Sequence, residues 1–151
     1  MKIIKDKKII VTGATGGIGN EICKLLNDQG AKLILIASGE EKLRDLSDKL
    51  GGSVDYIVAD LSSMEGVKKL SAKIAKINDI ECLINLAGMS YFGALNSQEF
   101  DDVVKLYNIN VLAPVLLSKA VLPAMIKNNS GHVVNIGSIF GSIGFGFFAS
   151  Y

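Results

Sequence analysis

A glycine-rich octapeptide, Thr12 to Gly19, contains the residues of this chain whose types and spacing best fit a chemical task. Its glycines let the backbone approach a ligand closely, and a helix that starts among them offers unpaired N–H groups and a favourable dipole to an anion. The apolar run Ile9 to Val11 precedes it, and a helical pattern from Ile18 to Leu26 follows. A strand, a glycine-rich turn and a helix start form a cradle for a phosphate, so this segment predicts nucleotide binding. The competing interpretation is a strand-to-helix turn that only needs flexible residues.

Strands and helices must hold this loop in place. The chain alternates short apolar runs with longer helical periods, and this pattern predicts where these elements lie. Gly30 and Gly51 stand where two of the helices would end, and Ser62 or Ser63 is a natural N-cap for a third. Alternating strands and helices imply βαβ units, whose right-handed crossovers give an α/β fold with a doubly wound parallel sheet. We expect strands over residues 9–11, 33–37, 56–59, 82–85 and 132–136, and helices over residues 17–29, 40–50, 64–76, 97–107 and 110–127.

The loops that follow the expected strands contain the other chemically suggestive groups. In doubly wound sheets the binding crevice lies outside the carboxyl ends of the strands, so these loops should share one edge of the sheet. The candidate site therefore lies at this edge. The loops contain Gly13 to Gly19, Ala37 and Ser38, Asp60 and Leu61, Ala87 and Gly88, and Gly137 and Ser138.

These loops, taken together, contain an ordered set of residues. The glycine loop is followed by Asn85, Ala87 and Gly88, then by Asn110, Ser138 and, 13 residues later, Tyr151. This order and spacing resembles the short-chain dehydrogenase/reductase family over the whole chain. The resemblance implies a Rossmann-type sheet of strand order 3-2-1-4-5 and an oxidoreductase that transfers a hydride between NAD or NADP and a carbonyl or secondary alcohol. A 3-oxoacyl carrier-protein reductase-like activity is one candidate among many.

The resemblance assigns three catalytic residues. Tyr151 would be the general acid/base, Ser138 would hold the substrate oxygen, and Asn110 would order a proton-relay water. Hydride transfer belongs to the nicotinamide, so the protein need only orient the substrate and move one proton. Simpler interpretations stay open: Ser138 as a cap at the end of the fifth strand, Asn110 as a helix cap, and Tyr151 as an aromatic residue without a role.

One departure from the family pattern concerns the lysine that follows the tyrosine by four residues. A tyrosine hydroxyl has an ordinary pKa of about 10, so it needs a nearby cation to transfer a proton at neutral pH. The sequence stops at Tyr151. We therefore expect residues 1–151 to form one dinucleotide-binding Rossmann domain, truncated after the fifth strand and inactive alone. The alternative is a non-catalytic dinucleotide-binding module or an inactive remnant.

The resemblance also places the cofactor. NAD enzymes of this fold have an acidic residue near the end of the second strand, where this chain has Ala37 and Ser38. We therefore favour NADP over NAD, although neither Gly16 nor Ser38 is basic. Asp60 matches the position that reads the adenine amino group, and Leu86 replaces an asparagine of the family's usual run. The expected cofactor-binding residues are Gly13, Thr15, Gly16, Gly17, Ile18, Gly19, Ser38, Asp60, Leu61, Ala87 and Gly88.

Composition argues against several other classes of protein, which include nucleic-acid-binding and metal-binding proteins. The formal net charge of +1, from 16 basic and 15 acidic residues, gives no electrostatic case for nucleic acid or an anionic membrane. Cys23 and Cys82 are typical small core residues of a reduced protein, and neither has a metal-ligand partner at a useful spacing. No secretory signal precedes Ile9. We expect a cytoplasmic protein without a metal.

Apolar segments indicate how the chain packs and what it contacts. Residues 109–126 form a long apolar stretch that contains two prolines, which favours a buried helix over a membrane span. Its small polar face and the exposed edge of the fifth strand predict self-association of this chain and a homo-oligomer in the full-length form. The substrate is a small molecule that the sequence does not name. Phe145, Phe147 and Phe148 either line its entrance or pack in the core.

Overall fold

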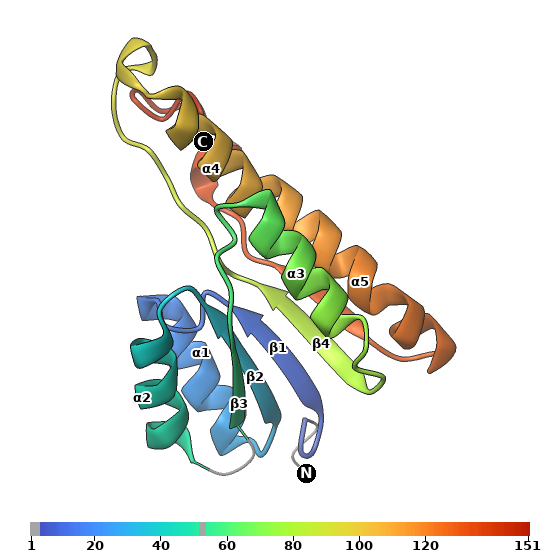
Figure 1. Cartoon of the computed structure of the whole chain (residues 1–151). Helices are drawn as coiled ribbons and strands as arrows, with labels where there is room; N and C mark the ends of the chain where they lie inside the picture. Colours follow the sequence, from blue (N-terminus) through green and yellow to red (C-terminus); the bar gives the residue numbers. More distant parts are fainter. Residues whose placement is uncertain (1–3, 52–53) are drawn as a thin grey trace.

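The computed structural model describes residues 4–51 and 54–151, and in these residues five strands form one parallel sheet (Figure 1). The strand order is β3-β2-β1-β4-β5, so the expected α/β fold class and strand order are confirmed. Each neighbouring pair is parallel, which requires a crossover connection between successive strands. The strands are β1 (Lys8–Thr12), β2 (Lys32–Ala37), β3 (Val54–Val58), β4 (Ile80–Asn85) and β5 (His132–Asn135).

Helices cover both faces of the sheet and create two separate cores. Helices α1 (Gly17–Asp28) and α2 (Glu40–Leu50) lie on one face, and α3 (Met64–Ile74) and α5 (Ala113–Lys127) lie on the other (Figure 1). Because side chains alternate along a strand, Ile9 and Val11 of β1 enter the core under α1 and α2, whereas Ile10 enters the core under α3 and α5. Burial on both faces explains the continuous apolar runs Ile9–Val11 of β1 and Leu33–Ile36 of β2.

Two helix boundaries show how local sequence positions the elements. The positive φ of Gly30 (84°) follows the last turn of α1, and its N–H donates to the carbonyl of Asn27 at 2.8 Å. At the start of α3, the sequence offered either Ser62 or Ser63 as the N-cap. Ser63 is the N-cap, because its Oγ accepts a hydrogen bond from the Gly66 N–H at 3.1 Å.

The helical segments before β5 differ from the sequence expectation. Helix α4 (Phe100–Tyr107) runs through a π turn, η2 (Asn108–Leu112), directly into α5, so no separate helix begins at Asn110. The interpretation of Asn110 as a helix cap is therefore wrong. No proline or glycine lies in this junction before Pro114, which follows the π turn in the first turn of α5.

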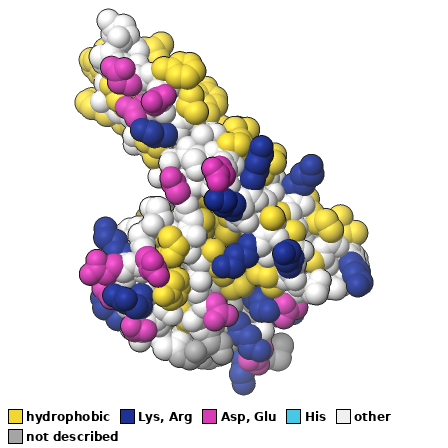
Figure 2. All heavy atoms as spheres, in the orientation of Figure 1, with side chains coloured by type: hydrophobic (Ala, Val, Ile, Leu, Met, Phe, Trp, Pro, Cys, Tyr) yellow, Lys and Arg dark blue, Asp and Glu magenta, His cyan; other side chains and the backbone are white. Residues whose placement is uncertain are grey.

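The continuous helix Phe100–Lys127 has one buried face and one apolar exposed face. By length and composition alone it is long and apolar enough to cross a membrane, and one 18-residue window of it has a mean hydropathy of 1.8. Its inner face packs in the core through Leu106, Leu117 and Val121, which are nearly fully buried. Figure 2 shows hydrophobic side chains along its outer side. The exposed apolar residues of this helix are Phe100, Val104, Tyr107, Val111, Leu112, Val115, Leu122 and Ile126.

Candidate functional site

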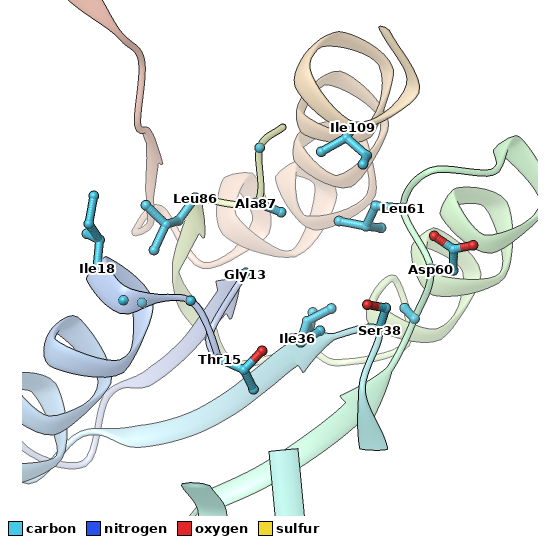
Figure 3. Close-up of a pocket in the computed structure, with 16 residues that line it drawn as sticks. Gly13, Thr15, Ile18, Ile36, Ser38, Asp60, Leu61, Leu86, Ala87 and Ile109 are labelled. Carbon is cyan, nitrogen blue, oxygen red and sulfur yellow. The ribbon is translucent and has the colours of Figure 1, made fainter. Parts of the chain in front are cut away.

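A cleft of about 370 Å³ opens at the carboxyl ends of β1 to β4 (Figure 3). All eleven residues that we expected to bind the cofactor line it, although they come from four different loops. The structure therefore brings the expected cofactor-binding residues together. Sequence reasoning did not assign the remaining lining residues, whose apolar side chains carry no chemical signal beyond their position beside the loops. These are Ile36, Ala37, Ala59, Leu86 and Ile109.

The glycine loop fits closely against the loop that follows β4. Gly13 has a φ of +67°, and a Cβ on it would lie 2.9 Å from both the N and the Cα of Ala87. Only glycine combines this conformation with this contact. Helix α1 then starts at Gly17 behind the N-cap Gly16, which provides no capping side chain. The positive end of the helix dipole is thus directed at the cleft, as an anion site requires.

Thr12 joins the two loops, and the sequence reasoning gave it no role of its own. Its side chain is buried, and its hydroxyl donates to the Ile84 carbonyl at 3.4 Å. The same oxygen accepts hydrogen bonds from the N–H groups of Leu86 and Ala87, each at 3.0 Å. Leu86 stands where the family has an asparagine. Its N–H bonds to the Thr12 hydroxyl, and its side chain lines the cleft.

Ser38 and Asp60 bring oxygen atoms to the same end of the cleft, from the loops after β2 and β3 (Figure 3). Asp60 Oδ1 accepts hydrogen bonds from the Ser62 hydroxyl at 2.7 Å and the Ser62 N–H at 2.9 Å. These bonds hold the pKa of the Asp60 carboxyl below its ordinary value. Asp60 is therefore a charged acceptor at neutral pH, suited to an amino group on a ligand.

A second cavity of about 520 Å³ adjoins the cleft and contains all three candidate catalytic residues. Asn110, Ser138 and Tyr151 line it, and Ala87 and Gly88 line both cavities. Residues far apart in the sequence thus meet where the two cavities join. A ligand that crosses from one cavity to the other must pass Ala87 and Gly88.

The hydrogen bonds of Asn110 and Ser138 show what these two side chains hold within the protein. Asn110 donates to the Met89 carbonyl at 2.7 Å and accepts from the Met89 N–H at 2.9 Å, so its amide holds the loop after β4. Ser138 caps the short 3-10 turn η3 (Ile139–Gly141), with its Oγ accepting from the Phe140 N–H at 3.2 Å. Its hydroxyl proton remains available to another acceptor. Tyr151 has 38% of its surface exposed.

Aromatic side chains gather beside this second cavity. The Phe148 ring lies 6.1 Å from the Tyr151 ring and 5.2 Å from the Phe92 ring, measured between centroids. The Gly93 N–H donates to the Phe147 carbonyl at 2.9 Å, which joins the loop before α4 to the C-terminal segment. Phe145 and Phe147 are 56% and 60% exposed, so they are not core residues. None of the three phenylalanines lines the second cavity, so a role at its entrance stays a prediction.

The cysteines show no reactive environment. Cys23 of α1 is fully buried in the core that α1 and α2 cover, and burial raises the pKa of its thiol to about 12. Burial likewise raises the pKa of Cys82. Both therefore stay protonated, as small core side chains do. Within residues 4–51 and 54–151, no three histidine, cysteine or acidic side chains come together as a possible metal site.

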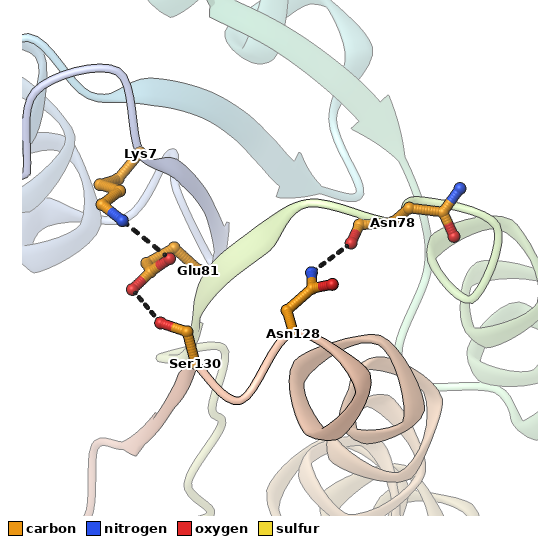
Figure 4. Close-up of polar contacts among 5 residues, drawn as sticks. All are labelled: Lys7, Asn78, Glu81, Asn128 and Ser130. Atoms are coloured by element: carbon orange, nitrogen blue, oxygen red, sulfur yellow. Dashed lines mark hydrogen bonds and ion pairs between the residues drawn. The ribbon is translucent and has the colours of Figure 1, made fainter.

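At the amino ends of the strands, away from both cavities, polar contacts join β4 to the segments beside it (Figure 4). Glu81 of β4 accepts hydrogen bonds from the Ser130 hydroxyl at 2.8 Å and from Lys7 Nζ at 3.1 Å. Asn128 donates its amide to the Asn78 carbonyl at 2.8 Å. These contacts fasten the turn between α5 and β5 to the start of β4. They lie at the amino ends of the strands and have no connection with the candidate site.

The Glu81 contacts predict an acid-sensitive contribution to stability. The Ser130 hydroxyl and then Lys7 hold the pKa of Glu81 below its ordinary value, about 4.3 for a free glutamate. A carboxyl whose pKa is lowered on folding stabilises the fold above its unfolded pKa, and this contribution is lost as the pH falls through the folded value. We expect Glu81→Gln to flatten part of the decrease in melting temperature below about pH 4.5. Ser130→Ala should act in the same window, and parallel profiles for wild type and Glu81→Gln would contradict the assignment.

The protein-family comparison agrees with the geometry of the two cavities. The family model described as short chain dehydrogenase matches residues 7–151. A short chain dehydrogenase of Pseudocercospora fijiensis is 34% identical over 142 residues, which cover 90% of this chain and 46% of the relative. The dehydrogenase/reductase SDR family member 7B of Mus musculus is 35% identical and is matched by 98% of this chain over 48% of its own length. The chain thus spans about half the length of these curated relatives.

Solved structures show the same architecture. A metagenomic short-chain oxidoreductase (SDR) in complex with NADP is 32% identical, with a TM-score of 0.89 over 98% of this chain and 68% of that one. The bulky-bulky ketone specific alcohol dehydrogenase from Comamonas testosteroni is 28% identical, with a TM-score of 0.91 over 96% of this chain and 60% of that one. With the family model matching nearly all of its length, the chain belongs to the short-chain dehydrogenase/reductase family.

Proposed function

We propose that this chain is the dinucleotide-binding and proton-transfer part of an NAD(P)-dependent oxidoreductase that acts on a carbonyl or a secondary alcohol. The observation that carries the proposal is the junction of the two cavities at Ala87 and Gly88. The glycine loop would hold the phosphates of a dinucleotide, and Ala87 and Gly88 would border its other end. The cavity of Ser138 and Tyr151 adjoins this point and would hold the substrate.

Each residue of the second cavity has a role in this proposal. When bound, the nicotinamide supplies or accepts the hydride, so the chain's own task is to orient the substrate oxygen and move one proton. The Tyr151 hydroxyl exchanges that proton, and the Ser138 hydroxyl donates a hydrogen bond to the same oxygen. Asn110 holds the Met89 loop, and its Oδ1 keeps a second lone pair that can accept from a water.

In the family pattern a lysine follows the tyrosine by four residues, which is a position beyond the 151 residues of this sequence. We therefore propose that these 151 residues bind a dinucleotide without turning over a carbonyl substrate. The competing function is a dinucleotide-binding module or remnant without activity. Both proposals predict binding, and turnover by a chain that includes the lysine separates them.

The proposed cofactor is NADP, because the end of β2 has the neutral Ala37 and Ser38 in place of an acid, and one structure similar to this chain holds NADP. We expect the chain to bind NADPH more tightly than NADH. Ser38→Asp should weaken NADPH binding by about tenfold, because a carboxylate then faces the 2′-phosphate at the end of the cleft. Titration of reduced-nicotinamide fluorescence gives both dissociation constants.

A matched control is Ser90→Asp, which adds the same charge at an exposed position that lines neither cavity. It should leave both dissociation constants within twofold of wild type. A wild-type preference for NADH would overturn the choice of NADP. If the wild type bound neither dinucleotide, the proposed site itself would be wrong.

We also propose a cytoplasmic protein that forms a homo-oligomer through the outer face of α4 and α5. This face exposes Val104, Val111 and Leu122 among other apolar side chains (Figure 2). Contiguous exposed apolar surface of this kind marks an interaction site or promotes self-association. Sedimentation equilibrium measures the state directly, and a monomer at all concentrations would contradict the oligomer.

A further inference from the structure

The π turn η2 lies between the two loops that border the cleft. Asn108 and Asn110 each donate the side-chain amide to a backbone carbonyl at 2.7 Å, on Ser62 and Met89 respectively. Ile109, between them, lines the cleft itself. Side chains two residues apart lie about 200° apart around a helix axis, so the two amides reach in opposite directions. One turn of helix thus holds the loop after β3 and the loop after β4.

The Asn108 contact leads directly to Asp60. Ser62 uses its hydroxyl and its N–H to hold the Asp60 carboxylate, and its carbonyl accepts the Asn108 amide. Asn108 has only 7% of its surface exposed, and it follows Leu106, which is anchored in the core. The buried Leu61 side chain packs this loop against the core, and the Asn108 amide ties the backbone beside Asp60 to the helix.

We propose that Asn108 is a positioning residue that sets the Asp60 carboxylate at the adenine end of the dinucleotide cleft. The inference rests on the proposed function and adds to it the residue on which recognition of the adenine half depends. Without the Asn108 amide, the Ser62 carbonyl loses its partner and the Asp60 loop gains freedom that a ligand must then remove. Asn108 lines neither cavity, so we expect the glycine loop and the Tyr151 cavity to keep their geometry in a variant at this position.

If Asn108 only supported the fold, its loss would weaken binding of both halves of the dinucleotide equally. The test therefore measures the binding of each half separately. We would measure dissociation constants for NADPH, for adenosine 2′,5′-bisphosphate and for reduced nicotinamide mononucleotide by calorimetry. In Asn108→Leu, which keeps the size but removes the amide, NADPH and the adenine fragment should each bind roughly three- to tenfold more weakly. The nicotinamide fragment should bind as it does to the wild type.

Two further variants make the result decisive. Asn108→Ala removes the amide without adding a charge, so it should show the same difference between the two fragments if Asn108→Leu fails to fold. Asn128→Leu removes a comparable amide-to-carbonyl bond at the far edge of the sheet (Figure 4) and should change none of the three constants.

The outcomes separate this inference from the proposed function. Equal losses for both fragments, or no loss for either, would overturn the role of Asn108 while leaving the dinucleotide site in place. If the wild type bound none of the three ligands, the proposed function would be wrong, and the inference with it.

Discussion

Gly19→Ala is expected to lower the free energy of unfolding by about 2–4 kcal/mol and to abolish dinucleotide binding. A Cβ at this position would lie 2.2 Å from the Gly13 carbonyl oxygen and 2.9 Å from that of Ala14. Both atoms belong to the backbone of the glycine loop, so no side-chain rotation relieves the overlap. Helix α1 must move away from the loop, and the phosphate cradle opens. Chemical denaturation and NADPH titration measure the two effects.

Gly17→Ala is the matched control, because it makes the same change two residues earlier in the same helical turn. A Cβ on Gly17 meets no atom within 4 Å. Alanine favours the helix over glycine by up to about 1 kcal/mol, so this variant should be as stable as wild type or more so. Similar losses in the two variants would show that the close approach of Gly19 to the loop is unimportant.

Tyr151→Phe should lower kcat by about a thousandfold or more in a chain that continues past Tyr151 and supplies the lysine, because it removes the group that transfers the proton. The dissociation constant for NADPH should change by less than twofold, since Tyr151 lines the second cavity and not the cleft. Steady-state reduction of a ketone at saturating NADPH gives kcat, and fluorescence titration gives the binding constant.

Tyr107→Phe is the control for this experiment. Tyr107 lines the same cavity and is 50% exposed, so the variant also loses one hydroxyl from the cavity wall. Its kcat should stay within a few fold of wild type. A Tyr151→Phe enzyme with normal kcat would remove the proton-transfer role. Turnover by the 151-residue chain would show instead that the lysine is not needed.

The sheet and the cleft were predictable because they depend on local patterns. Apolar runs between glycine-rich turns mark buried parallel strands, and parallel strands place their following loops at one edge. Gly13, Ser38, Asp60 and Ala87 could therefore be assigned to one site from four separate segments, and all four line the cleft. Strand ends were less well defined, and β3 runs over Val54–Val58 against an expected 56–59.

What the sequence did not predict depends on tertiary contacts. The helix continues through Asn110 because Leu106 and Ala113 on either side of the π turn are both buried in the core. The hydroxyl of Thr12 acquires its role only because β4 lies beside β1, more than 70 residues away in sequence. The amides of Asn108 and Asn110 look alike in sequence, and only the fold shows which loop each one holds.

The central place of β1 in the sheet also sets the order in which the molecule can assemble. On one side β1 pairs Lys8 with Lys32, and on the other it pairs Lys8 with Ile80. The second pairing closes a loop three times longer, which costs about 1 kcal/mol more chain entropy, so the half with β2 and β3 gains its contacts first. The glycine loop belongs to this early half, whereas Ala87 and Gly88 reach the cleft only when β4 pairs with β1. We therefore expect a nucleotide to bind the finished sheet and not its precursor, so that binding would stabilise the last step of folding.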